Sequence, residues 1–166
     1  MTRLMKQYVL GDMQALYYLD EKNGDIELLL LPEGISVKEK EIDEAHYHSD
    51  HLVQVRLSGD IYTGCYSPGI SMRVDKDSNR FKYDSQSVTE EGKEKDIVTF
   101  LKDERGYSVS HHLVYKEGGK TLKSFCVFEN KGDTDACLEL LSSFSLGKIS
   151  PFMDGDGYGT LKLHRL

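Results

Sequence analysis

Three histidines and an aspartate crowd into the six residues HYHSDH at positions 46–51. The spacing H-x-H-x-D-H is one with which some zinc hydrolases bind metal, because His46 and His48 share one side of an extended segment and can offer two imidazole nitrogens to one ion. A stand-alone zinc-dependent hydrolase is therefore one hypothesis. The later histidines His111 and His112 are adjacent in sequence, so they are expected on opposite faces of a strand.

The context of HYHSDH argues against a metal site. The motif follows the charged segment EKEIDEA and leads into LVQVRL at 52–57. In the metallo-β-lactamase-like enzymes that share the spacing, the motif follows a buried strand and opens a helix, within a layered architecture that needs many helices. We therefore predict no metal ligand and no cofactor, and we interpret the histidines as supports of a polar loop.

Two further segments have residue types that could do chemistry. Cys65 in TGCYSPG lies among turn residues, but no strained-turn signature accompanies it, so we interpret it as an ordinary thiol. The acidic run DGDG at 154–157 is typical of calcium loops, yet the twelfth position counted from Asp154 is Arg165, where an EF-hand needs glutamate. We expect a glycine-rich turn there, and we assign no catalytic residue to the chain.

The composition limits the partners and the compartment. The 166 residues carry 28 Asp and Glu against 21 Lys and Arg, a formal net charge of -7. Nucleic acids and anionic membranes are polyanions that attract Lys and Arg, so we predict that the chain binds neither. Three cysteines, without the density of a disulfide scaffold, and an N-terminus that lacks the apolar run of a signal peptide indicate a cytoplasmic protein.

The elements that must position these residues are predicted to be strands. LVQVRL alternates apolar and polar residues, which is typical of a half-buried strand. Four later segments are similar in alternation or in their content of β-branched and aromatic residues: 96–101, 107–115, 121–128 and 137–146. Turn signals that contain Gly or Asn separate them. The sequence therefore predicts one all-β domain, a large sandwich of two antiparallel sheets.

Local patterns add detail to this fold. The segments 36–45 and 84–96 are polar and charged, and we expect the first to be an exposed loop or a single turn and the second to be a solvated loop. Tyr17 and Tyr18 are successive strand residues, so one ring is expected to pack inward and the other to face solvent or another domain.

The cysteines and the last residues of the sequence support two more expectations. Cys126 and Cys137 flank the turn NKGD and are expected to face each other as core neighbours across a hairpin. The terminal GTLKLHRL places Leu161 and Leu163 on one face of a strand and then stops without a polar tail. We expect that strand to continue in a longer protein.

The segment FENKGDTDACLELLSSFSLGKISPF, from Phe128 to Phe152, is followed by LHRL. It resembles the N-terminal domain of the α-galactosidases of glycoside hydrolase family 36, in which a hairpin of the type F-x-N-x-G-x-x-x-x-x-L-x-x-x-x-S precedes a strand with an equivalent of LHRL. YVLGDMQALYY is similar to the opening strands of these enzymes, and YHSDHLVQV to their loop Y-G-x-x-D-[FY]-R-x-P-A. The resemblance covers nearly the whole chain, most strongly residues 128–166 and least through 60–120.

The resemblance implies that residues 1–166 are an N-terminal antiparallel β-supersandwich of two large packed sheets, galactose-mutarotase-like. The catalytic (β/α)₈ barrel and a C-terminal β-domain would then be absent from this chain. Retaining hydrolysis in the family depends on two aspartates of that barrel, so the domain itself would be non-catalytic. The implied partners are its own barrel, a galactoside substrate and further copies of the enzyme in a homo-oligomer.

Asp50 falls on the aspartate of the family's x-D-[FY]-R loop, which hydrogen-bonds the terminal galactose in the active-site pocket. A carboxylate that accepts two hydroxyl protons orients a polyol well. His51 and Leu52 stand where the family has an aromatic residue and an arginine. This difference could accommodate N-acetylgalactosamine, as in an α-N-acetylgalactosaminidase. A free-standing carbohydrate-binding sandwich is a third hypothesis beside the galactosidase domain and the zinc hydrolase.

Overall fold

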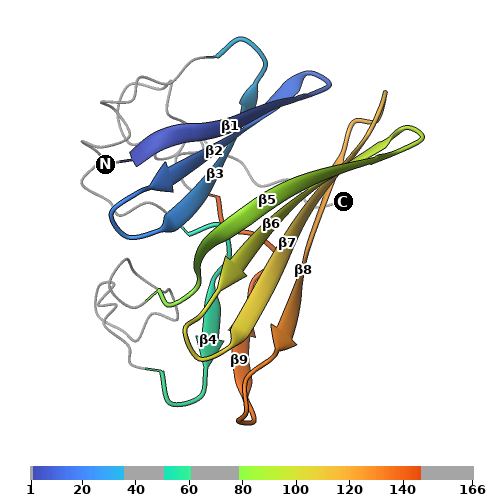
Figure 1. Cartoon of the computed structure of the whole chain (residues 1–166). Coiled ribbons are helices and arrows are strands. Elements are labelled where there is room, and N and C mark those ends of the chain that lie inside the picture. The colour runs from blue at the N-terminus through green and yellow to red at the C-terminus, as the bar shows by residue number, and fades with distance from the viewer. Residues whose placement is uncertain (1, 36–50, 61–78, 147–166) are drawn as a thin grey trace, which may run out of the picture.

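The computed structural model describes residues 2–35, 51–60 and 79–146. Within these ranges the chain forms nine strands and no helix, and every strand pairs antiparallel with its neighbours (Figure 1). The predicted all-β class and antiparallel pairing are therefore confirmed. Among the described residues there is also no helix long and apolar enough to cross a membrane.

The first sheet is a meander of three strands, β1 (Thr2–Leu10), β2 (Met13–Asp20) and β3 (Asp25–Pro32), with β2 in the centre. Because side chains alternate across a strand, Tyr17 and Tyr18 of β2 lie on opposite faces, as predicted. Both are buried, at 0% and 3% exposure. The expectation that the second ring faces solvent or another domain is therefore wrong as far as solvent is concerned, because Tyr18 packs in a second apolar cluster on that face with Leu16, Leu29 and Leu31.

The second sheet has four strands in sequence order: β5 (Lys82–Glu91), β6 (Glu94–Lys102), β7 (Tyr107–Lys116) and β8 (Leu122–Asn130). The last three match the strands predicted from alternation to within two residues at each end. Their inner faces carry most of the fully buried residues, and their outer faces carry polar residues together with exposed apolar ones such as Phe100 and Val127. Short turns join all four, so the sheet is built from local hairpins.

The prediction of a loop at 84–96 is wrong. Most of this segment is the strand β5, and Gly92, at a φ of 60°, makes the turn into β6. As the first strand of the sheet, β5 has a neighbour on one side only, and most of its residues are exposed. Such an edge strand needs no alternating apolar residues, and charges like Glu90 and Glu91 discourage pairing with foreign strands.

The short strands β4 (Val55–Leu57) and β9 (Leu138–Leu141) pair with each other and complete the first layer. Leu52 connects them to the first sheet: its backbone N–H donates to the carbonyl of Ile26 at 2.9 Å, and its carbonyl accepts from Ser145 at 2.8 Å. The strands predicted at 52–57 and 137–146 are therefore real but shorter than expected. One layer holds β1, β2, β3, β4 and β9, and the other holds β5 to β8.

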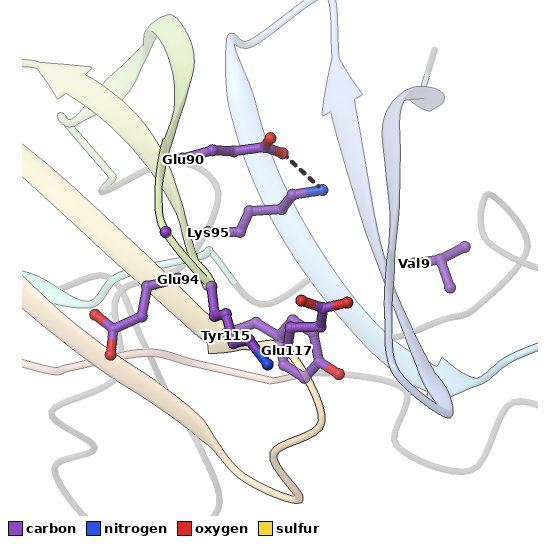
Figure 2. Close-up of a pocket in the computed structure, with 8 residues that line it drawn as sticks. Val9, Glu90, Glu94, Lys95, Tyr115 and Glu117 are labelled. Carbon is purple, nitrogen blue, oxygen red and sulfur yellow. Dashed lines mark ion pairs between the residues drawn. The ribbon is translucent and has the colours of Figure 1, made fainter.

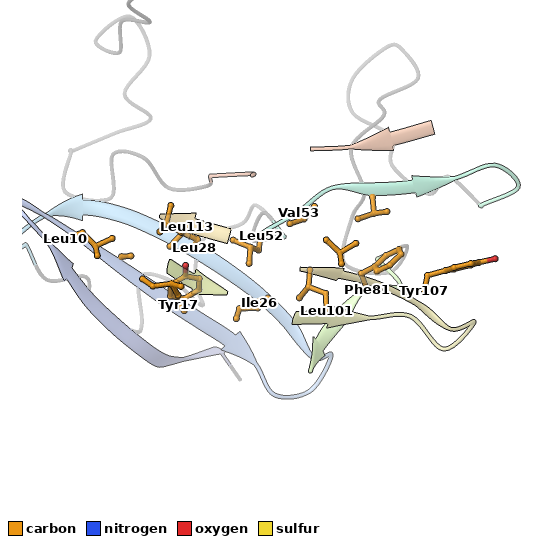
Figure 3. Packing of buried hydrophobic residues seen from close by; sticks show 14 of the residues in the cluster. Leu10, Tyr17, Ile26, Leu28, Leu52, Val53, Phe81, Leu101, Tyr107 and Leu113 are labelled. Carbon is orange, nitrogen blue, oxygen red and sulfur yellow. The ribbon is translucent and has the colours of Figure 1, made fainter. Parts of the chain in front are cut away.

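The core lies between these two layers (Figure 3). Its members come from every part of the described chain and are almost completely shielded from water. Burying each large aliphatic side chain contributes roughly 1.5–3 kcal/mol. The sandwich predicted from the sequence is thus a single packed unit, whose largest fully buried core side chains include Tyr17, Leu10, Leu28, Leu52, Ile97 and Leu113.

The turn between β6 and β7 is held by Arg105. Its Nη2 lies 2.7 Å from Asp103 Oδ2 and its Nη1 lies 2.8 Å from Asp60 Oδ1, so it ties this turn to the residues that follow β4. Burial alone would raise the pKa of Asp103, but the hydrogen bonds and charge of Arg105 lower it. The guanidinium also lies 5.2 Å from the ring centre of Tyr107.

Gly106 in this turn gives a first test of the packing. It has a φ of +91°, and a Cβ built on it would lie 2.9 Å from the Cα of Gly132. We expect Gly106→Ala to destabilise the fold by roughly 3 kcal/mol in urea unfolding, since positive φ and backbone overlap add. Gly118→Ala is the matched control, because Gly118 has a φ of +76° with open space around it, and should cost only about 1 kcal/mol. Equal losses for both variants would contradict this geometry.

Candidate functional site

Asp50, which the resemblance assigns to sugar binding, lies outside the described residues. The structure does describe its neighbour His51, whose side chain is only 4% exposed. His51 is thus part of the interior of the sandwich, and it is the residue that directly follows Asp50 in the sequence. Other predictions that fall outside the described residues concern His46, His48, Cys65, the segment 36–45, DGDG at 154–157 and the terminal strand at 159–166.

His51 belongs to a cluster of four polar side chains, together with Asp25, Asn79 and Lys82. Asp25 begins β3, and its Oδ1 accepts hydrogen bonds from Asn79 Nδ2 at 2.8 Å and from Lys82 Nζ at 2.7 Å. Asn79 Nδ2 also lies 3.2 Å from His51 Nδ1, and the same ring nitrogen lies 3.7 Å from Asp25 Oδ1. We call these four residues the polar anchor.

Burying the polar groups of the anchor costs free energy unless they are hydrogen-bonded. Asp25 is 5% exposed and Asn79 is 7% exposed, so their polar atoms have little access to water. A buried carboxylate is tolerated only when it is paired and hydrogen-bonded, and Lys82 and Asn79 supply those interactions. The anchor therefore fixes residues 51 and 79 against the start of β3.

A second polar group lies on the outer face of the four-stranded sheet. His112 Nδ1 is 2.8 Å from Asp96 Oδ2, and His112 Nε2 is 3.3 Å from Ser110 Oγ. Ser110 and His112 are alternate residues of β7, and Asp96 lies on β6 opposite Val114, so the register alone brings them together. Serine, histidine and aspartate connected in this order are the arrangement that activates a serine in many hydrolases. The sequence analysis missed this group.

The group lacks the other half of a hydrolase site. A tetrahedral intermediate needs free N–H donors aimed at its oxyanion, whereas the backbone around Ser110 is bonded into ladders with β6 and β8 on both sides. The ring of Phe125 stacks on His112 at 4.4 Å between centres, and Lys123 Nζ lies 4.9 Å from the ring centre of Phe125. Within the described chain, these side chains are suited to binding rather than to acyl transfer.

A hollow of about 520 Å³ opens on this outer face. Its floor is apolar, with Val98, Val114 and Phe125, and its margins are charged. The acidic margin lies on β5 and β6, and the basic margin on β7 and β8. Apolar and hydrogen-bonding groups are thus combined on one open surface.

A smaller hollow of about 260 Å³ lies near Val9 of β1 and the turn between β5 and β6 (Figure 2). Glu90 and Lys95 form an ion pair at 3.0 Å across that hairpin, and Figure 2 shows Val9 apart from them on β1. Glu90 is 65% exposed, so this pair is solvated and contributes little. The hollow has no converging buried polar groups among the described residues, and we assign it no site.

The inner face of the sheet holds a buried histidine. His111 is 0% exposed, and its Nε2 lies 2.9 Å from Ser124 Oγ. Burial, with a smaller effect from the neighbouring His112, lowers its pKa from 6.5 to about 4. His111 and His112 therefore lie on opposite faces of β7, as the sequence predicted, and only His112 belongs to the outer group.

The cysteines depart from the prediction. Cys126 packs against the core, and its Sγ donates to the carbonyl of Ser143 at 3.4 Å. Burial raises the pKa of this thiol to about 12, which makes it a poor nucleophile. Cys137 is exposed, so the two cysteines are not core neighbours. The reason is that β8 ends at Asn130 and β9 pairs with β4 rather than with β8.

Within residues 2–35, 51–60 and 79–146, no three His, Cys, Asp or Glu side chains gather closely enough to hold a metal ion. Comparison with known proteins adds no assignment. No family model matches the chain, and neither the curated proteins nor the solved structures include a significant match to it. The candidate sites therefore stand on their own geometry, as the polar anchor and the outer group on β6 to β8.

The buried His111 predicts a dependence of stability on pH. The pKa of the folded state, about 4, is below the value of 6.5 expected for the unfolded chain, so the unfolded state binds more protons between these values. The free energy of unfolding should fall by roughly 3 kcal/mol as the pH drops from 6.5 to 4. Urea unfolding of His111→Gln should lose this part of the pH dependence. His112→Gln, on the opposite face, is the control and should keep it.

The polar anchor predicts a second stability effect. Asn79→Ala removes the amide that donates to Asp25 and to the carbonyl of Phe81. Leaving a buried carboxylate short of a partner should cost about 2–4 kcal/mol in thermal or urea unfolding. Asn130→Ala is the matched control: its amide donates to the carbonyl of Thr134 on the exposed side of the chain, and its loss should cost less than about 1.5 kcal/mol. An Asn79 variant as stable as the control would show that the anchor does not hold the fold.

Proposed function

We propose that this chain is a non-catalytic β-sandwich domain of an α-galactosidase that recognises terminal α-linked galactose through Asp50 and associates with a separate catalytic barrel. Two findings support the proposal: the resemblance centred on residues 128–166, and the antiparallel sandwich that the resemblance implies. The observation that carries it is the buried position of His51 in the polar anchor.

The reason lies in how a sugar-binding carboxylate must be held. An aspartate orients a galactose ring only if its own backbone is fixed, since a mobile donor or acceptor loses most of its hydrogen-bond energy to ordering. Covalent geometry puts the Cα of Asp50 about 3.8 Å from that of His51. The His51 side chain is buried, and both backbone groups of the next residue, Leu52, are hydrogen-bonded: its N–H to Ile26 and its C=O to Ser145. The sandwich thus provides a rigid base next to Asp50.

The described residues also support the non-catalytic part of the proposal. Hydrolysis of a glycoside by the retaining mechanism needs two carboxyl groups about 5–5.5 Å apart on either side of the bond. The outer group holds one carboxylate, Asp96, which already pairs with His112, and the other two carboxylates at the hollow, Glu91 and Glu94, are exposed at the turn between β5 and β6. We therefore assign the bond-breaking step to the barrel, with the sandwich contributing to assembly and recognition.

One alternative has its own observation. The outer hollow combines apolar side chains such as Val98 with His112 and Asp96, which suits a sugar's apolar C–H faces and hydroxyl groups. A free-standing carbohydrate-binding sandwich would bind galactosides through this face without any barrel. Binding of raffinose to the isolated chain, abolished by His112→Ala and unchanged by Asp50→Ala, would favour this alternative.

The proposal is tested by complementation. A separately expressed catalytic barrel of a family 36 α-galactosidase, mixed with this chain, should gain turnover of an aryl α-galactoside and should bind the chain in a pull-down. The reason is that the barrel brings both catalytic aspartates while the chain brings Asp50. Absence of both association and turnover would contradict the proposal. About one zinc per chain in elemental analysis, lost in His46→Ala, would instead support the zinc hydrolase.

The role of Asp50 is tested in the assembled enzyme. Asp50→Ala should lower kcat/KM for the galactoside by roughly 5- to 150-fold, equivalent to about 1–3 kcal/mol, the cost of a lost charged hydrogen bond. Most of the effect should appear as a higher KM. Asp12→Ala is the control, because Asp12 lies in the β1–β2 turn with its side chain 77% exposed. Unchanged kinetics for Asp50→Ala would remove this residue from the site.

A further inference from the structure

The outer face of the four-stranded sheet shows a pattern that its fold does not need. Antiparallel pairing aligns outward-facing residues of β6, β7 and β8 in rows that cross the three strands. Each row joins one residue of β6 to one of β8 through a residue of β7. The four rows are Asp96–Val114–Lys123, Val98–His112–Phe125, Phe100–Ser110–Val127 and Lys102–Ser108–Glu129.

The two middle rows are apolar at both ends. Phe100 on β6 is 38% exposed and Val127 on β8 is 44% exposed, although both are large hydrophobic residues. Between them stands the small Ser110, and in the neighbouring row His112 lies between Val98 and Phe125 and stacks on the ring of Phe125. Contiguous apolar side chains rimmed by charge are typical of protein interaction surfaces.

The two end rows carry charges of opposite sign on β6 and β8. Asp96 on β6 is matched by Lys123 on β8, and Lys102 on β6 is matched by Glu129 on β8. The sign therefore reverses between the two strands at each end of the face. A single ligand with one kind of charge does not fit this arrangement, but a second copy of the same face does.

We propose that this outer face is a homodimer interface, in which two copies pack face to face about a two-fold axis that runs along β7. Such an axis lays β6 of one copy on β8 of the other and β7 on β7, within the range of aligned sheet packing. Phe100 then meets Val127 of the second copy and Val98 meets Phe125. At the two ends, Asp96 meets Lys123 and Lys102 meets Glu129.

Lys102 and Glu129 are able to change partners. Lys102 Nζ pairs with Asp84 at 2.9 Å and Glu129 with Lys131 at 2.8 Å within one copy, and both side chains are more than half exposed, at 64% and 55%. Exposed pairs of this kind contribute little to stability, so their exchange for contacts across the interface carries little penalty. This dimer does not depend on the galactoside proposal, because Asp50 has no part in it.

The size of the face sets the expected strength. The three strands β6, β7 and β8, about 4.8 Å apart and seven residues long at about 3.3 Å per residue, cover roughly 330 Å² on each copy. Two such faces cover about 660 Å², which is below the size of stable specific interfaces and fits a weak, transient association. The dimer should therefore dissociate on dilution rather than persist at every concentration.

The first experiment is sedimentation equilibrium of the full chain up to about 1 mM. We expect a reversible monomer–dimer equilibrium that Phe100→Ser weakens at least 10-fold, because it removes the large exposed apolar side chain of β6 from both copies. Val9→Ser is the matched control, since Val9 is 51% exposed on β1, away from this face. A chain that stays monomeric throughout, or a dimer equally sensitive to both substitutions, would overturn the proposal.

The second experiment uses charge exchange, which leaves the core untouched. In a K102E homodimer or an E129K homodimer, two pairs of like charges face each other, so each variant alone should be at least 10-fold weaker than the parent chain. An equimolar mixture of the two variants restores opposite charges in both pairs of a mixed dimer. We expect the mixture to dimerise as the parent does. A mixture as weak as its components would overturn the two-fold arrangement.

Discussion

The backbone hydrogen bonds of Leu52 are the constraint on which the rest of the structure depends. They join β3 to the segment that contains β4, and through Ser145 to the segment that contains β9. Without them the first layer would end at β3, and the inner faces of β7 and β8 would lack a cover. Because an unpaired N–H or C=O is costly in an interior, a residue that is 0% exposed has to make both bonds or leave the core. The same peptide fixes His51 and therefore the base of the segment with Asp50.

The strands that could be predicted from the sequence are those with one solvent-exposed face and one buried face. β6 and β7 alternate between core and outer face, so their period was visible in residues 96–101 and 107–115. β5 lies at an edge and is mostly exposed, so its sequence does not alternate between apolar and polar residues. For that reason the segment resembles a loop. The opposite failure occurs at Gln54, which is 8% exposed although alternation places it outside. Residues 51–55 are all buried, so the polarity of a side chain there does not indicate whether it points to the core or away from it.

The candidate sites divide in the same way. Asp96 and His112 could have been placed together from the sequence, because a short turn joins their strands and fixes the register that brings them within 2.8 Å. The polar anchor could not be predicted in this way, since Asp25 and Asn79 are 54 positions apart in the sequence and no local pattern indicates a contact between such distant residues. The failed pairing of Cys126 with Cys137 has the same origin. A hairpin was assumed around NKGD, whereas the chain crosses to the other layer after β8.

The neighbouring residues His111 and His112 lie in different environments, because successive side chains of β7 point to opposite faces of the sheet. The pleat sends His111 into the core, where burial keeps it neutral and where its protonation opposes folding. It sends His112 to the outer face, where Asp96 and Phe125 hold it without burying it. A change on the outer face therefore reaches the core through the backbone of β7, which is bonded on both sides, and through the charge of His112, which lowers the pKa of His111. No described side chain is shared between the outer group and the polar anchor, so the proposed association surface on β6 to β8 and the proposed role of Asp50 are independent of each other.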